Sequence, residues 1–144
     1  MISILVSCNK SYKSPQEYSD IKMYEYMGKP WDDDAINNVI YSSRYTEISL
    51  YSKIEKLNYK YTSNLTVNQR IDSALFKKKY NKYVLSPNCP VGYKNVLLLY
   101  HDNTLKYVVK FNEFCEEGFL IDSNTKNVYY LDLGYDEFMQ LIYH

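Results

Sequence analysis

Few residues in this chain could carry out chemistry. There are two histidines, and one of them is the terminal residue His144. The other, His101, precedes Asp102, and a carboxylate that orients a histidine ring is typical of acid–base catalysis. Adjacent residues in a turn rarely orient one another in this way, so we interpret the pair as ordinary turn residues. An enzyme that uses His101, alone or with Cys115 as nucleophile, is kept as an alternative hypothesis.

The sequence also lacks the usual motifs for binding a metal or a phosphate group. Cys8, Cys89 and Cys115 show no paired spacing, which predicts free thiols in a reducing compartment and no zinc site. Four glycines leave no glycine-rich phosphate-binding loop. The adjacent carboxylates of residues 32–34 are interpreted as a helix cap, because consecutive side chains on a helix point in different directions. We therefore expect no enzymatic activity, no cofactor and no metal.

Charge is balanced over the whole chain but not along it. The formal net charge is zero, which gives no general attraction to nucleic acid or to an anionic membrane. Residues 1–83 carry 13 basic and 9 acidic side chains, whereas residues 84–144 carry 4 and 8. The acidic excess of the second half is either a scatter of surface charges or a binding face for a basic partner.

The last third of the chain predicts two β-hairpins. An almost wholly apolar run at residues 95–100 is typical of a strand covered on both faces. Residues 105–111 alternate in polarity, which predicts a strand with Lys106 and Lys110 on its wetter face. A second pair of runs, residues 118–122 and 127–133, is joined by four polar residues typical of a hairpin turn.

A short helix is expected to close this hairpin region. Tyr135, Phe138, Met139 and Ile142 have the spacing of one helix face. The first half is expected to be helical as well, after a short strand at residues 2–6. The first of these helices is predicted from Tyr18, Ile21, Tyr24 and Met27, which recur every three residues and would form its apolar face. Further helices are predicted over residues 32–40, 48–57 and 66–83, the last beginning with a capping box formed by Thr66 and Gln69.

These patterns predict an α+β fold in a single domain, residues 1–144. N-terminal helices at about residues 15–83 are expected to pack on a C-terminal four-stranded antiparallel meander closed by a short helix, at about residues 94–143. At 144 residues the chain is long enough to bury one core. The sequence contains no run of about 18 apolar residues, which a membrane-spanning helix would need, and we expect a cytoplasmic protein.

The segment from Gly118 to Ile142 resembles the C-terminal part of bacterial toxin-immunity proteins. The run Gly-Phe-Leu-Ile-Asp, a polar turn, Asn-Val-Tyr-Tyr-Leu-Asp and then Tyr-Asp-Glu-Phe-Met-Gln-Leu-Ile is similar to the hairpin and helix of the SUKH superfamily and of contact-dependent inhibition immunity proteins. The resemblance covers about 25 residues. The Leu-Pro-x-x-Tyr and Asn-Gly motifs of full SUKH members are not present in the first half. The resemblance implies an inhibitor that binds a cognate toxin domain, often a nuclease.

This resemblance and the acidic second half lead to one functional expectation. Nucleases hold polyanions in basic clefts, so a cognate inhibitor gains association rate by presenting acidic groups. Tyrosines among those groups would serve as aromatic anchors. The expected partner-binding residues are Glu113, Glu116, Glu117, Asp122, Tyr129, Tyr130, Asp132 and Tyr135, with Asp136 and Glu137 as weaker candidates.

A second hypothesis is a viral or phage accessory protein that binds a host protein or nucleic acid. Its motivation is the lysine- and tyrosine-rich run at residues 77–83, where lysines would meet phosphates and tyrosines would stack on bases. Cations at the end of a helix also offset the helix dipole, which is the simpler explanation. Neither a nucleic acid nor a membrane is therefore the expected partner.

Overall fold

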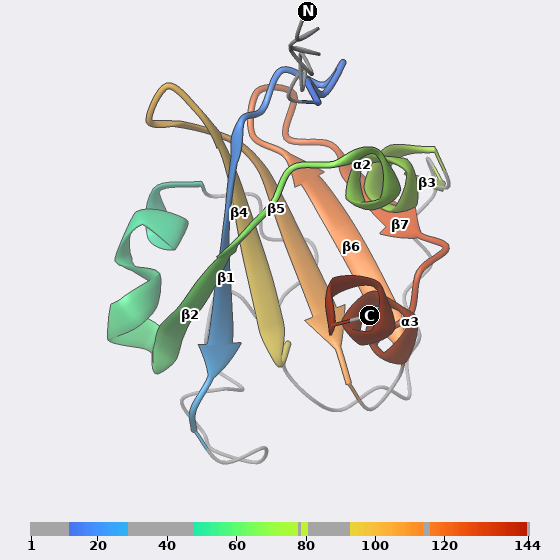
Figure 1. Ribbon diagram of the computed structural model, residues 1–144. Helices are drawn as coiled ribbons and strands as arrows, with labels where there is room; N and C mark the ends of the chain where they lie inside the picture. The colour runs from blue at the N-terminus through green and yellow to red at the C-terminus, as the bar shows by residue number, and fades with distance from the viewer. Residues whose placement is uncertain (1–11, 29–47, 78, 81–92, 114–115, 144) are drawn as a thin grey trace, which may run out of the picture.

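The structure is a computed structural model that describes residues 12–28, 48–77, 79–80, 93–113 and 116–143. These residues build one seven-stranded sheet in the order β2-β1-β4-β5-β6-β7-β3, and every neighbouring pair is antiparallel (Figure 1). The strands are β1 (Asp20–Tyr26), β2 (Tyr59–Leu65), β3 (Lys79–Tyr80), β4 (Asn95–His101), β5 (Thr104–Asn112), β6 (Glu117–Asp122) and β7 (Val128–Leu131).

Three helical segments accompany the sheet in the described part of the chain. They are the 3-10 segment η2 (Ile48–Leu57) and the α-helices α2 (Gln69–Phe76) and α3 (Tyr135–Tyr143). Lys53 has non-helical dihedral angles (φ −114°, ψ 22°), so η2 consists of two short stretches with a kink between them. The side chain of Asn68 caps α2 by accepting a hydrogen bond of 2.9 Å from the backbone N–H of Ile71.

The predicted architecture is wrong. The first half of the chain supplies β1, β2 and β3 to the same sheet that holds β4 to β7, and α2 is the only α-helix in the described part of residues 15–83. The strands β4 to β7 are therefore not a separate four-stranded meander under N-terminal helices. The predicted strand at residues 2–6 and the helix at residues 32–40 lie outside the described residues.

Strand β1 is the clearest correction. The spacing of Tyr18, Ile21, Tyr24 and Met27 predicted a helix, but residues 20–26 form a strand between β2 and β4. Ile21 and Met23 pack into one core of buried residues, and Tyr26 packs into the other. Tyrosine and isoleucine favour pleated surfaces, and pairing on both edges of β1 outweighs a helical spacing of four residues.

The helix boundaries also differ from prediction. Residue 68, not Thr66, caps α2, and the helix ends at Phe76 rather than continuing through residues 77–83. Lys79 and Tyr80 form β3, which pairs with Leu131 and Tyr130 of β7. The predicted regular helix at residues 48–57 is the kinked 3-10 segment η2.

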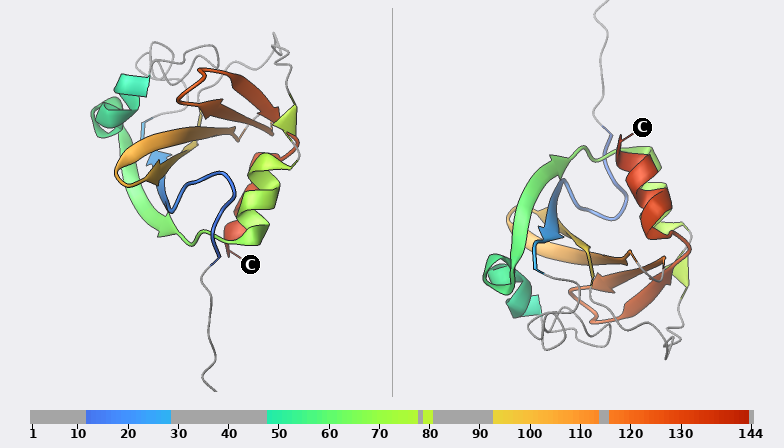
Figure 2. Two further views of the ribbon diagram at one scale, coloured as in Figure 1. Left: turned by 90° about the horizontal axis from the view of Figure 1, so that it is seen from above. Right: turned by 90° about the horizontal axis from the view of Figure 1, so that it is seen from below.

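The two faces of the sheet carry different layers. One face, here called the helical face, packs Leu97, Leu99, Val109, Phe111 and Leu120 against α2 and α3. Figure 2 shows the sheet curling around these two helices. The other, here called the tyrosine face, packs Tyr26, Tyr59, Tyr93, Val96, Leu98, Val108, Phe119 and Ile121 with Tyr51 and Ile54 of η2. Because both faces of the sheet are covered, residues 95–99 of β4 are all buried. This confirms the prediction of a strand covered on both faces.

The edge strand β2 carries a β-bulge. Met23 pairs with Ser63 and Tyr24 pairs with Tyr61, so Thr62 is an extra residue in the β2 strand. Its hydroxyl donates a hydrogen bond of 3.1 Å to the carbonyl of Met23. A bulge of this kind bends the strand and increases its local twist.

A buried carboxylate ties the segment before β1 to α2. Asp72 is 5% exposed and accepts hydrogen bonds from the hydroxyls of Tyr12 (2.9 Å), Ser14 (2.5 Å) and Tyr18 (3.0 Å). Buried polar side chains are normally satisfied by hydrogen bonds in this way. The network therefore fixes the entry to β1 on the helical face, where Tyr18 also stacks on Phe76.

Candidate functional site

The predicted partner-binding residues do not form one surface. Tyr129 packs against the core of the helical face, whereas Tyr130 packs against the core of the tyrosine face. Successive residues of a strand point to opposite faces, so these two tyrosines cannot both anchor one partner on one side of the sheet. Tyr130 shares its face with Glu117, which alternates along β6 with Phe119 and Ile121. Burial first, and then Glu117 and Asp132, raise the pKa of Tyr130.

Asp122 lies away from the other carboxylates of the set. Its Oδ1 accepts hydrogen bonds from the backbone N–H groups of Asn124 (2.9 Å) and Thr125 (3.2 Å). It ends β6, the strand that Glu117 begins, so the two residues are about 17 Å apart along the strand. The role of Asp122 is to shape the turn between β6 and β7.

Four carboxylates, from β1, the β5–β6 connection and α3, lie at the end of the sheet where β1 and β5 finish. We call this group the acidic corner: Glu25, Glu113, Glu116 and Asp136. Burial first, and then Glu113, Glu25 and Asp136, raise the pKa of Tyr135. Glu25 is paired with Asn95, and Asn95 with Phe111, so the ends of β1 and β5 lie on either side of the start of β4. The Oε2 of Glu116 accepts a hydrogen bond of 3.0 Å from the backbone N–H of Asp136.

The conformation of Glu116 is set by this contact. Its φ of 50° lies in the left-handed region, which few non-glycine residues adopt. From there its carboxylate reaches the N-terminus of α3, where a negative charge offsets the helix dipole. Glu116 is exposed, as expected, but it is held by α3, and Glu117 begins β6 and is only partly exposed. Burial raises the pKa of Glu117.

The corner is strongly acidic on its outer surface. Glu113, Glu116 and Asp136 are exposed. Glu25 is 37% exposed and forms an ion pair of 3.1 Å with Lys94. No group of three or more acidic, histidine or cysteine side chains in the described residues is arranged to hold a metal ion. The negative charge of the exposed carboxylates attracts basic groups.

The histidine pair is an exposed turn feature. Nε2 of His101 lies 3.4 Å from Oδ2 of Asp102, and their side chains are 48% and 90% exposed. Asp102 and Asn103 have φ values of 46° and 63°, as in the tight hairpin turn that joins β4 to β5. Cys8, Cys89 and Cys115 lie outside the described residues, as do two of the lysines of the basic run, Lys78 and Lys82.

Two residues of structural interest were missed by the sequence analysis. Glu25 belongs to the acidic corner, but its strand was predicted as helix. Lys110, expected on a wetter face, is fully buried on the tyrosine face, with its Nζ 4.6 Å from the ring centroid of Tyr93 and 6.0 Å from that of Tyr51. Burial lowers the pKa of Lys110 to about 7. The sequence held one signal for this burial: Lys110 lies two residues after Val108 in the same strand, so both point to the same face, and Val108 is buried there.

The fold is thus that of an α+β protein with a single curled antiparallel sheet. Comparison with models of protein families, with curated proteins and with solved structures gives no match. Among the described helices, none has the length and apolar character needed to cross a bilayer.

Proposed function

We propose that this protein is an immunity-type inhibitor that binds and neutralises a cognate toxin domain through the acidic corner. The observation that carries the proposal is the gathering of carboxylates from β1, the β5–β6 connection and α3 at one end of the sheet, next to Tyr135. Like charges held together on a surface attract a partner of opposite charge and repel others. The resemblance of residues 118–142 to immunity proteins supplies the class of partner.

The proposal revises the set of binding residues. Glu113, Glu116, Asp136 and Tyr135 share one corner, and Glu25 joins them. Glu117, Asp132 and Tyr130 lie together on the tyrosine face and would form at most a flank of the contact. Asp122 shapes the turn between β6 and β7 and is not part of it. Tyr129 packs against the core of the helical face and is left out of the proposed set. A nuclease toxin fits because its cleft must be basic to hold a polyanion. We expect the complex to form in the cytoplasm, since the cysteine spacing indicates free thiols.

The test is binding to the product of the adjacent gene, first by pull-down and then by stopped-flow association at several salt concentrations. Glu113→Lys combined with Glu116→Gln should slow association roughly tenfold at low salt and flatten its salt dependence. Glutamine keeps an acceptor for the backbone of Asp136, so α3 stays capped. Glu17→Lys is the matched control, because Glu17 is an exposed carboxylate that precedes β1. Equal association rates in the double variant and the control would refute the acidic corner.

A further inference from the structure

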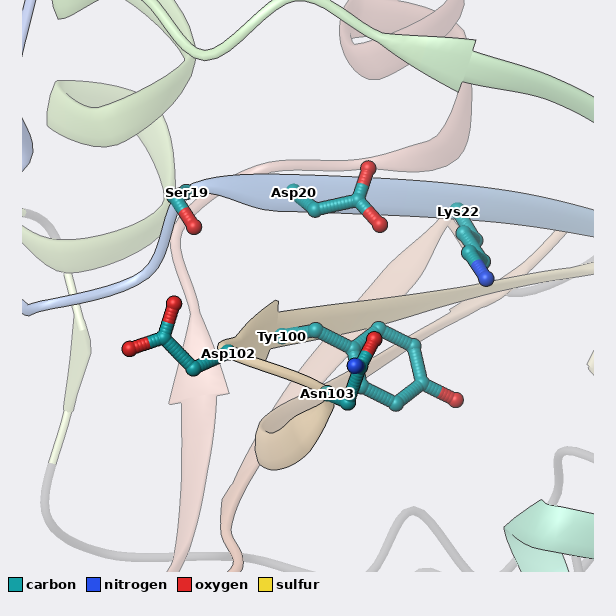
Figure 3. A pocket seen from close by; sticks show the side chains of 6 residues that line it. All are labelled: Ser19, Asp20, Lys22, Tyr100, Asp102 and Asn103. Atoms are coloured by element: carbon teal, nitrogen blue, oxygen red, sulfur yellow. The ribbon is translucent and has the colours of Figure 1, made fainter.

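Two hollows flank the ring of Tyr100 on the tyrosine face. The turn hollow, of ≈ 360 Å³, is lined by Ser19, Asp20, Lys22, Tyr100, Asp102 and Asn103 (Figure 3). The η2 hollow, of ≈ 380 Å³, lies against η2, and its lining includes Tyr24, Tyr51, Lys53, Glu55, Lys56 and Tyr100. Tyr100 is the residue common to both. The two hollows therefore adjoin at one aromatic ring.

The strands place these side chains by simple alternation. Asp20, Lys22 and Tyr24 occupy alternate positions of β1 and so point to the same face. Asp20 is paired with Tyr100 of β4 in the sheet register. Figure 3 shows Ser19, Asp20 and Lys22 along β1, with Tyr100, Asp102 and Asn103 along the end of β4 and its turn. The segment η2 is a third element here, because its residues line the η2 hollow together with Tyr100.

The two hollows carry opposite charge. Asp20 and Asp102 outnumber Lys22 in the turn hollow. Lys53 and Lys56 outnumber Glu55 in the η2 hollow. A ligand that spans Tyr100 would therefore meet a net negative site at one end and a net positive site at the other. This pattern fits a dipolar ligand better than a polyanion, whose binding needs a basic excess along its whole path.

The ring between the hollows offers stacking surface and hydrogen-bond donors. Nζ of Lys22 lies 5.3 Å from the ring centroid of Tyr100, so the ring already accepts a cation on its face. Tyr24 packs edge-on against Tyr61 with centroids 5.8 Å apart, which extends the row of rings toward β2. Burial, and then the charge of Glu55, raises the pKa of the Tyr24 hydroxyl. Burial, and then the neighbouring Tyr24, raises the pKa of the Tyr100 hydroxyl. Both therefore stay protonated and can donate to carbonyl oxygens.

We propose that the two hollows on either side of Tyr100 form a groove for an extended, proline-rich peptide with a basic residue at one end and an acidic residue at the other. Polyproline II segments present carbonyl acceptors, lack many N–H donors and dock between aromatic rings. The basic residue would lie against Asp20 and Asp102, and the acidic residue against Lys53 and Lys56. This inference is independent of the acidic corner, because it uses other residues.

The test is NMR titration of the ¹⁵N-labelled full chain with a synthetic peptide of six prolines flanked by one arginine and one glutamate. Backbone signals of residues in both hollows should shift together. A peptide with glutamate at both ends should bind more weakly. Asp102→Asn should weaken binding of the arginine peptide by up to about fivefold and should not weaken the glutamate peptide, because it removes a repelling charge. Asparagine tolerates the left-handed conformation of residue 102, so the turn should persist.

A second variant tests the tyrosine hydroxyl. Tyr100→Phe keeps the ring and the fold and should weaken the peptide roughly two- to tenfold through loss of one hydrogen bond. Glu113→Gln, in the acidic corner, is the control and should bind the peptide as the unaltered chain does. Absence of shifts at millimolar peptide, or shifts that the two hollow variants leave unchanged, would overturn the groove. Shifts produced by an oligothymidine instead of the peptide would also overturn it, in favour of a nucleic-acid site.

Discussion

The amine of Lys110 lies between two tyrosine rings with no exposed surface. Burial lowers its pKa in the folded protein to about 7, from 10.5 in the unfolded chain. Between these values the unfolded chain binds more protons than the folded one. The free energy of unfolding should therefore rise with pH above about 7, by at most about 1.4 kcal/mol per pH unit, and level off near pH 10.

Lys110→Met provides the variant for this prediction. Methionine has a similar length and no charge to bury, so the variant should gain stability most at pH 6 and lose that gain progressively until about pH 10. Urea unfolding followed across this pH range measures both effects. Lys60→Met, at an exposed position, is the control and should keep the slope of the unaltered chain. A Lys110→Met variant with that same slope would contradict the assignment.

At the scale of elements, the start of α2 offers a direct choice between two capping residues. Asn68→Ala removes the side-chain oxygen that accepts from Ile71 and should cost about 1 kcal/mol of unfolding free energy. Thr66→Ala is the matched control, and it should change stability by only a few tenths, because Thr66 does not cap the helix. Chemical denaturation of both variants measures the difference. A larger loss for Thr66→Ala would restore the predicted capping box.

The same helix illustrates what sequence patterns could and could not predict. Local signals located a helix near α2, the turn at residues 101–104 and the spacing of α3, because caps, turns and apolar periodicity act over a few residues. The strand β1 depends on partners far along the chain, with Tyr26 paired to Tyr59 and Tyr24 to Val96. Apolar residues and tyrosines at a spacing of three can occur in a helix or in a strand, so pairing with β2 and β4 determines that residues 20–26 form a strand.

The acidic site was predictable only in part for the same reason. Glu113, Glu116 and Tyr135 all lie in the last third of the chain, where the acidic excess was visible. Glu25 belongs to β1, which the residue spacing wrongly predicted as a helix. Tyr129 and Tyr130 point to opposite faces of the sheet because they are successive residues of β7. Only the register of the assembled sheet shows which carboxylates meet.

At the scale of the whole molecule, the sheet is open, and β2 is one of its two edges. The bulge at Thr62 interrupts the regular spacing of hydrogen-bonding groups along β2. A flat edge would be a template for pairing with a second molecule, and bulges are a common means of preventing this. Strand β2 has a single charged side chain, Lys60, so charge repulsion contributes little to the protection.

We therefore expect Thr62 to limit edge-to-edge assembly of the protein at high concentration. Deletion of Thr62 should give a regular ladder between β1 and β2 and a straighter outer edge. We expect the deletion variant to form dimers and larger species as concentration rises, measured by sedimentation velocity. Thr62→Ser, which keeps the bulge and a hydroxyl for the carbonyl of Met23, should stay monodisperse at the same concentrations. One extra residue in an edge strand would then be a determinant of solubility, and a site to preserve in any engineered form of the chain.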